Sequence, residues 1–124
     1  MKTIRKGHNA ERHYAKKFRE MGYNKCCTTR ASSRLLDNCM VDLNYIPFLV
    51  QIKAGKQKKL SYSLVLKTIR EKIAEHLPED AHERSLIPII IHYKHVGTGR
   101  KRNEYDELVV LAFSDFQKLI KPLR

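Results

Sequence analysis

Apolar residues recur along the chain with two different periods, and each period indicates a different kind of element. Helical spacing begins after Asn9, which can cap a helix, and stops before Gly22, which can end one. The same spacing returns over 62–77, ahead of Pro78. A short last helix is predicted over 115–120, so we expect three helices in all.

Five shorter segments are rich in β-branched and aromatic residues and are typical of strands. They cover residues 25–29, 40–45, 48–53, 87–93 and 107–113. The turn residues between the second and third of these segments favour a hairpin. The remaining stretches are expected to be irregular: a basic arm (1–8), a polar loop (30–38), a basic loop (54–59), an acidic loop (78–84) and a basic turn (96–103).

The resulting order, α-β-β-β-α-β-β-α, contains no repeat and no linker. A chain of 124 residues suits one hydrophobic core. We therefore predict an α/β fold in a single domain over 1–124, with a mixed sheet of about five strands flanked by helices.

Charge narrows the class of partner. Lys and Arg number 25 against 13 Asp and Glu, so the formal net charge is +12 at pH 7. A small domain this cationic repels itself when it is compact, and a polyanion relieves the repulsion. A nucleic acid is the expected partner because its phosphate backbone is the commonest polyanion. A peripheral membrane role, or charge that serves only solubility, is the alternative.

The lengths of the apolar runs and the pattern of cysteines indicate the cellular compartment. The runs are too short to span a bilayer, and no apolar signal core follows the basic N-terminus. The cysteines, Cys26, Cys27 and Cys39, are odd in number and lack the spacing of a zinc site. These features predict a cytoplasmic protein with reduced thiols, no membrane association and no small-molecule cofactor.

One carboxylate, one amide and one ammonium can meet on the predicted hairpin. Asp42 lies within the second predicted strand, and Gln51 and Lys53 lie within the third. Alternation gives Gln51 and Lys53 the same face, while their neighbours point into the core. Asp42, the Gln51 side-chain oxygen and the Ile52 carbonyl would offer oxygen ligands to Mg²⁺, which assists phosphodiester hydrolysis. Lys53 would stabilise charge on the phosphate or act as a base.

The same residues are also ordinary in a lysine-rich chain, because strand edges often carry charges that prevent aggregation. Neighbouring groups favour the catalytic interpretation. Glu11 on the first helix would add a second carboxylate, although a solvated carboxylate near a helix start fits its position equally well. Groups able to hold a DNA backbone flank the site. They are Arg5 and Lys6 in the arm, Arg30, Ser32 and Arg34 in the polar loop, and Lys56, Lys58 and Lys59 in the basic loop.

These segments resemble the PD-(D/E)XK nuclease superfamily and, within it, the small archaeal-type Holliday junction resolvases. The similar motifs are the G-x-x-x-E of the first helix (6–11, KGHNAE), the Arg/Ser loop (30–33, RASS), the aspartate strand (41–43, VDL) and the E-x-K strand (51–53, QIK). The resemblance spans residues 6–59 in motif terms, and the later elements agree only in order and length.

The resemblance implies a restriction-endonuclease-like fold with a Mg²⁺ site that Mn²⁺ can also occupy. The ligands would be Glu11, Asp42, Gln51 and the Ile52 carbonyl. Gln51 departs from the usual acidic residue of the family. Because an amide offers an oxygen but no charge, the metal would depend more on Asp42 and Glu11.

The resemblance also implies that Lys53 is the catalytic lysine, that Ser32 and Arg30 contact the scissile region, and that a homodimer presents two sites to a roughly two-fold four-way junction. The predicted function is therefore a metal-dependent endonuclease for branched DNA, a Holliday junction resolvase. Sequence-specific nucleases usually need more surface to read bases, which favours this prediction. The alternatives are another nuclease of the superfamily, acting on duplex or damaged DNA, and a non-catalytic basic nucleic-acid-binding module.

Overall fold

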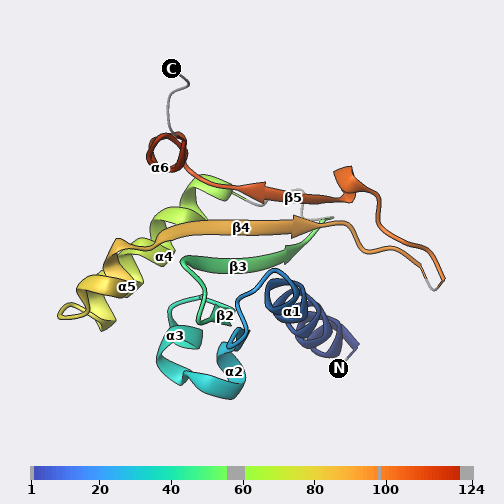
Figure 1. Cartoon of the computed structure of the whole chain (residues 1–124), viewed down its shortest axis with the longest axis horizontal. Helices are drawn as coiled ribbons and strands as arrows, with labels where there is room; N and C mark the ends of the chain where they lie inside the picture. The colour runs from blue at the N-terminus through green and yellow to red at the C-terminus, as the bar shows by residue number, and fades with distance from the viewer. Residues whose placement is uncertain (1, 56–60, 98, 121–124) are drawn as a thin grey trace.

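The computed structural model describes residues 2–55, 61–97 and 99–120, with side chains described from residue 7 onward. Figure 1 shows a three-stranded sheet with α1 below one edge and α6 beyond the other. In chain order the elements are α1 (Lys2–Glu20), β1 (Cys27–Thr28), α2 (Thr29–Ser32), α3 (Arg34–Asn38), β2 (Leu43–Asn44), β3 (Phe48–Ala54), α4 (Tyr62–His76), α5 (Ala81–Ser85), β4 (Ile87–Tyr93), a 3-10 turn η1 (Glu104–Asp106), β5 (Glu107–Val110) and α6 (Phe113–Leu119).

The predicted mixed α/β class with five strands is confirmed, but the strands form two sheets in the described part of the chain. β3 pairs in parallel with β4, and β4 pairs antiparallel with β5. β2 pairs antiparallel with β1, so the expected hairpin ladder between β2 and β3 is wrong. The reason lies in the backbone: Met40 and Tyr45 have positive φ angles of 68° and 63°, which interrupt the extended segment on both sides and leave only two residues of strand.

Both faces of the sheet are buried along most of β3 and β4. Val50 and Ile52 of β3 pack in a core with α1, whereas Leu49 on the opposite face packs in a second core with Ile69 and Ile73 of α4. Since helix α4 connects the parallel strands β3 and β4, it covers the second face as a crossover helix does. Residues Gln51 and Lys53 therefore share their face with the α4 core.

Three segments expected to be irregular are helical. The arm 1–8 is part of α1, which begins at Lys2, so Asn9 lies inside the helix and does not cap it. The loop 30–38 contains α2 and α3, because the Ser33 hydroxyl accepts a hydrogen bond from the Leu36 N–H and starts a new turn. The loop 78–84 overlaps α5, which Asp80 caps through the Glu83 N–H.

The chain's remaining elements agree with expectation in kind. β4 has the predicted bounds, β5 is shorter than predicted, and α6 begins at Phe113, two residues before the predicted start at residue 115. The three cysteines are free, as predicted, and Cys26 and Cys39 are buried. Within the ranges that the structure describes, no helix is both long and apolar enough to cross a membrane.

Candidate active site

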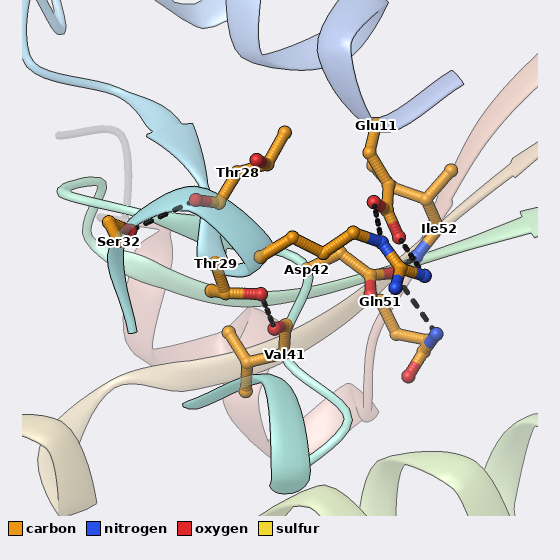
Figure 2. A network of polar contacts seen from close by, with 9 residues as sticks. Glu11, Thr28, Thr29, Ser32, Val41, Asp42, Gln51 and Ile52 are labelled. Carbon is orange, nitrogen blue, oxygen red and sulfur yellow. Dashed lines mark hydrogen bonds and ion pairs between the residues drawn. The ribbon is translucent and has the colours of Figure 1, made fainter. Parts of the chain in front are cut away.

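The backbone holds Asp42 rigidly beside the outer edge of β3. The Asp42 N–H donates to the Val50 carbonyl (2.7 Å), and the Asp42 carbonyl accepts from the Thr29 N–H (3.0 Å). The fully buried Thr29 also donates from its hydroxyl to the Val41 carbonyl at 2.6 Å (Figure 2). Asp42 is thus fixed on one side by β3 and on the other by the start of α2.

The Asp42 carboxylate lies in a nearly closed environment with 8% of the residue exposed. Its Oδ2 accepts from the Ile52 N–H at 2.7 Å and from Gln51 Nε2 at 3.0 Å. The predicted meeting of Asp42 and Gln51 is therefore confirmed, although one backbone hydrogen bond to the β3 edge brings it about instead of a hairpin. Burial raises the pKa of Asp42 to about 7; the Ile52 N–H and Lys53 oppose this rise, and the charge of Glu11 adds to it.

Glu11 approaches the same point from α1. It is 6% exposed, and both of its oxygens face the Arg30 guanidinium, with Nε–Oε2 at 2.9 Å and Nη2–Oε1 at 3.5 Å. The interpretation of Glu11 as a solvated carboxylate is wrong, because the residue is buried in the middle of α1. Arg30 comes from α2 and is about half exposed, so its guanidinium links the buried carboxylate to solvent.

The side-chain oxygen of Gln51 could accept a hydrogen bond or bind a cation. The residue is 7% exposed and its Nε2 donates to Asp42, but its Oε1 is buried with no partner among the described residues. A buried acceptor without a partner costs about 1–3 kcal/mol. In Figure 2, Glu11 and Gln51 lie on opposite sides of Ile52 and Asp42; the Gln51 nitrogen faces Asp42, and its oxygen points away from the two carboxylates.

The donors at this point fit a hard divalent cation. They are the carboxylates of Glu11 and Asp42 and the Ile52 carbonyl, which leaves the strand on the same edge as the Ile52 N–H; the Gln51 oxygen would join them only if its amide turned over. Mg²⁺ prefers such oxygen ligands and keeps several waters, so it needs few from the protein. No group of three or more His, Cys, Asp and Glu side chains suited to a metal is found in the described residues. Any cation here would rest on two carboxylates and the neutral oxygens.

Lys53 lies two residues further along β3 and is partly buried. In register it is opposite His92 of β4, and both side chains lie on the α4 face. The Tyr62 hydroxyl is hydrogen-bonded to His92 Nδ1, while His92 Nε2 is buried and has no partner among the described residues. The sequence interpretation missed this pair. Its signal was a single histidine near the end of the otherwise apolar run 87–93.

The other predicted residues do not join this group. Ser32 donates to the Thr28 carbonyl at 2.9 Å and accepts from Asn44 at 3.1 Å, and Figure 2 shows it well away from Glu11 and Gln51. Arg34 is exposed on α3. Five further predicted contacts with DNA have side chains outside the described residues: Arg5 and Lys6, which lie on α1, and Lys56, Lys58 and Lys59 of the basic loop.

Comparison of the chain with protein-family models, with curated proteins and with solved structures finds no match. The likeness in motif order to the resolvases therefore stays a prediction. The geometry itself consists of two buried carboxylates, an orphan amide oxygen and a lysine at the outer edge of β3.

Proposed function

We propose that the protein is a metal-dependent endonuclease that hydrolyses phosphodiester bonds in DNA, with four-way junctions as the expected substrate. The observation that carries the proposal is the meeting of Glu11 and Asp42, both buried, beside the amide group of Gln51. Burial of two neighbouring anions is unfavourable unless opposite charge compensates them. Arg30 compensates Glu11, whereas Asp42 receives only hydrogen bonds from an amide and a backbone N–H.

Glu11, Asp42, Gln51 and the Ile52 carbonyl would hold Mg²⁺, for which Mn²⁺ can substitute. Bound there, the ion would polarise the phosphate and make a bound water more acidic. Asp42 keeps its orientation through the Thr29 and Val50 backbones, so little reorganisation is needed when substrate arrives. The Lys53 ammonium would stabilise the negative charge that grows on the phosphate as water adds to phosphorus and the P–O bond breaks.

Arginine side chains near the carboxylates support a DNA path over this edge. Arg30 is half exposed, so its guanidinium can exchange the Glu11 carboxylate for a phosphate. Both groups are oxyanions that a guanidinium can bind through two hydrogen bonds. Arg102 stacks over the Tyr93 ring at 4.7 Å and borders a hollow of about 240 Å³ with Asn9 and His13 of α1. Two arginines from different parts of the chain thus lie beside residues of α1, in a chain of net charge +12.

We further propose that the protein acts as a homodimer, because two sites related by two-fold symmetry suit a junction with two equivalent strands. Each site would then cut one strand.

The test is incubation of the purified protein with a labelled four-way junction and with linear duplex of the same sequence, in Mg²⁺, in Mn²⁺ and in chelator. We expect cation-dependent cuts confined to the junction. Equal cutting of linear duplex would show that the protein cuts DNA in general and has no preference for junctions. Binding to both DNAs without cutting in any cation would refute the endonuclease and leave a basic binding module.

A further inference from the structure

Helix α6 turns its carboxylate toward the protein and its aromatic side chains outward. Its one buried residue is Asp115, while Phe113 and Phe116 are 72% and 42% exposed. Their ring centroids lie 6.4 Å apart, so the two rings form an outward-facing pair. A surface helix ordinarily turns its apolar stripe to the core and its charges to water. Exposed apolar surface of this kind is a feature that a binding partner would explain.

Ion pairs hold α6 in this orientation. Arg70 of α4 donates from Nη2 to both Asp115 oxygens at 3.1 Å, and Lys118 Nζ lies 3.2 Å from Asp115 Oδ1. Turning the aromatic face inward would break these contacts and leave the carboxylate without partners. The exposure of the two rings is therefore a property of the folded chain.

A recess opens between α4 and α6 beside the exposed rings. Its volume is about 690 Å³, within the ~300–1,000 Å³ range of pockets that bind small molecules, so it has room for a nucleotide. Tyr62 and Leu66 supply apolar surface on the α4 side, and Leu111 and Phe113 supply it on the other side. Figure 1 shows α6 beyond the β5 edge of the sheet and α1 below the β3 edge, so the recess is separate from the carboxylate site.

The charges that line the recess are mainly positive. Lys67, Arg70 and Lys118 line it, and Asp115 is the one carboxylate among its lining residues in the described part of the chain. Within that part Arg70 uses only Nη2 to bind Asp115, so its Nε and Nη1 can donate to a phosphate. Lys67 Nζ lies 3.7 Å from Glu71 Oε1, but both side chains are mostly exposed, so this pair is weak. The recess therefore attracts an anion.

We propose that the recess between α4 and α6 binds an unpaired segment of DNA, as a second site apart from the carboxylates. A base stacks on the exposed face of Phe113, and Lys67, Arg70 and Lys118 hold the adjoining phosphates. Proteins bind single strands in this way, with aromatic rings that take the faces of bases and cations that follow the backbone. The bases of a duplex already stack on one another, so an unpaired strand is the form that can use the ring.

The combination of ring and cations favours a nucleic acid over other occupants. A second copy of this chain carries a net charge of +12 and is repelled by the lining cations. A nucleotide joins a flat apolar ring and an anion in one unit, which matches a phenylalanine and three cations that line one recess. An acidic peptide has to supply the two from separate residues.

This site goes beyond the proposed function and depends on it only for the choice of DNA over RNA. Binding in the recess requires no divalent cation and no cleavage. A protein that binds unpaired DNA here but cuts no DNA would refute only the endonuclease. A nuclease whose binding of single strands is indifferent to Phe113 would refute only this site.

The experiment is fluorescence anisotropy of a labelled oligothymidylate of about ten nucleotides in chelator, with a duplex of the same length as reference. Phe113→Leu keeps an apolar side chain and removes the flat ring. We expect it to raise the Kd of the oligothymidylate about tenfold and to leave the Kd of the duplex unchanged. Phe113→Tyr keeps the ring and should bind as the wild type does. The matched control is Tyr105→Leu, at an aromatic residue that is 79% exposed elsewhere, and it should also bind as the wild type does.

A second variant tests the cations. Lys67→Gln should lower the slope of log Kd against log salt concentration by roughly 0.7, the value for one phosphate contact with a single strand. Lys16→Gln, on the exposed face of α1, is its control and should leave the slope unchanged. Because Lys67 is 74% exposed, this variant decides the question if Phe113→Leu does not fold.

The site would be overturned if Phe113→Leu bound the oligothymidylate as tightly as the wild type, or if Tyr105→Leu lost binding to the same extent. Equally effective competition by a glutamate-rich peptide of the same net charge would show that the recess selects charge alone, which would also overturn it. Tighter binding of the matching oligouridylate would overturn the choice of DNA. Circular dichroism of each variant verifies that loss of binding is not loss of the fold.

Discussion

The two edges of the three-stranded sheet show opposite exceptions to the usual pattern of buried apolar and exposed charged residues. Beside β3, the carboxylates of Glu11 and Asp42 are buried; beyond β5, Phe113 and Phe116 are exposed. Each arrangement is unfavourable for an isolated monomer in water. A cation would relieve the first and an apolar partner the second, so the kind of departure suggests the kind of partner.

The same contrast appears between two buried aspartates. Asp115 is about as buried as Asp42, but Arg70 and Lys118 both pair with it. Asp42 has no such pair in the described residues, and its pKa is raised to about 7 by burial, opposed by the Ile52 N–H and increased by Glu11. A buried carboxylate with its charge compensated is explained by the fold, whereas one without compensation is a candidate for binding a ligand.

The largest expected effect is on cleavage. Asp42→Asn keeps the shape of the side chain and removes its charge, so the rate of junction cleavage in Mg²⁺ should fall about a thousandfold or more. The dissociation constant of the junction in chelator should change less than about threefold, because Asp42 does not contact a phosphate. Glu75→Gln, on the exposed side of α4, is the control and should cleave as the wild type does. An active Asp42→Asn enzyme would remove the β3 edge as the site.

The next prediction concerns the free energy of unfolding, which should change in opposite directions when Asp42 and Asp115 are each replaced by asparagine. At pH 8 in chelator, Asp42→Asn should raise the free energy of unfolding, on the order of 2 kcal/mol, because a buried uncompensated charge is removed. Asp115→Asn should lower it by about 1–2 kcal/mol, because the charge is removed from a paired carboxylate whose partners are partly exposed. Urea denaturation measures both values. A loss of stability in both variants would contradict the contrast.

The pH dependence of stability should follow Asp42. In the unfolded chain its pKa is near 3.8, and burial raises it to about 7 in the folded chain. Ionisation therefore favours the unfolded chain, so this group's contribution to stability should decline as the pH rises from about 4 to about 7 and then remain constant. Denaturation at a series of pH values in chelator should show this decline in the wild type. The same decline in Asp42→Asn would assign it to another group.

A smaller effect is expected from the ion pair that compensates Glu11. Arg30→Ala should lower the free energy of unfolding by about 1 kcal/mol in chelator, because Arg30 is half exposed and its pairing is partly screened. Mg²⁺ should restore most of the loss, since a cation near Glu11 replaces the guanidinium. The exposed Arg34→Ala on α3 is the control, with almost no change. An Arg30→Ala loss that Mg²⁺ leaves unaltered would separate Glu11 from the cation site.

Local patterns predicted the elements that long apolar runs or strong breakers define. β4 has its predicted bounds because a β-branched run lies between turn residues, and α4 ends next to Pro78 as expected. The helices α2 and α3 were not predicted, because a capping serine such as Ser33 has the same polarity in a loop. The pairing of β2 was missed, because the positive φ angles of Met40 and Tyr45 leave no mark in an apolar pattern.

The site was predicted as far as alternation and short sequence separation allow. Asp42 and Gln51 are close in the sequence, and they meet as expected. The Arg30–Glu11 pair depends on where α2 packs against α1, and sequence spacing does not give that position. The orientation of α6 was unpredictable for a different reason. Periodicity reveals that a helix has an apolar face, but the ion pair of Asp115 with Arg70 decides which way the face turns.

The most direct test of the cation site is thermal unfolding of the wild type and Asp42→Asn at pH 8, each in chelator and in saturating Mg²⁺. In chelator, Asp42→Asn should melt at the higher temperature. Mg²⁺ should raise the Tm of the wild type by several degrees, about what a ligand bound only to the folded state produces, and should leave Asp42→Asn almost unchanged. Equal shifts in both proteins, or no shift in the wild type, would contradict the claim that the buried carboxylates at the β3 edge are held for a divalent cation.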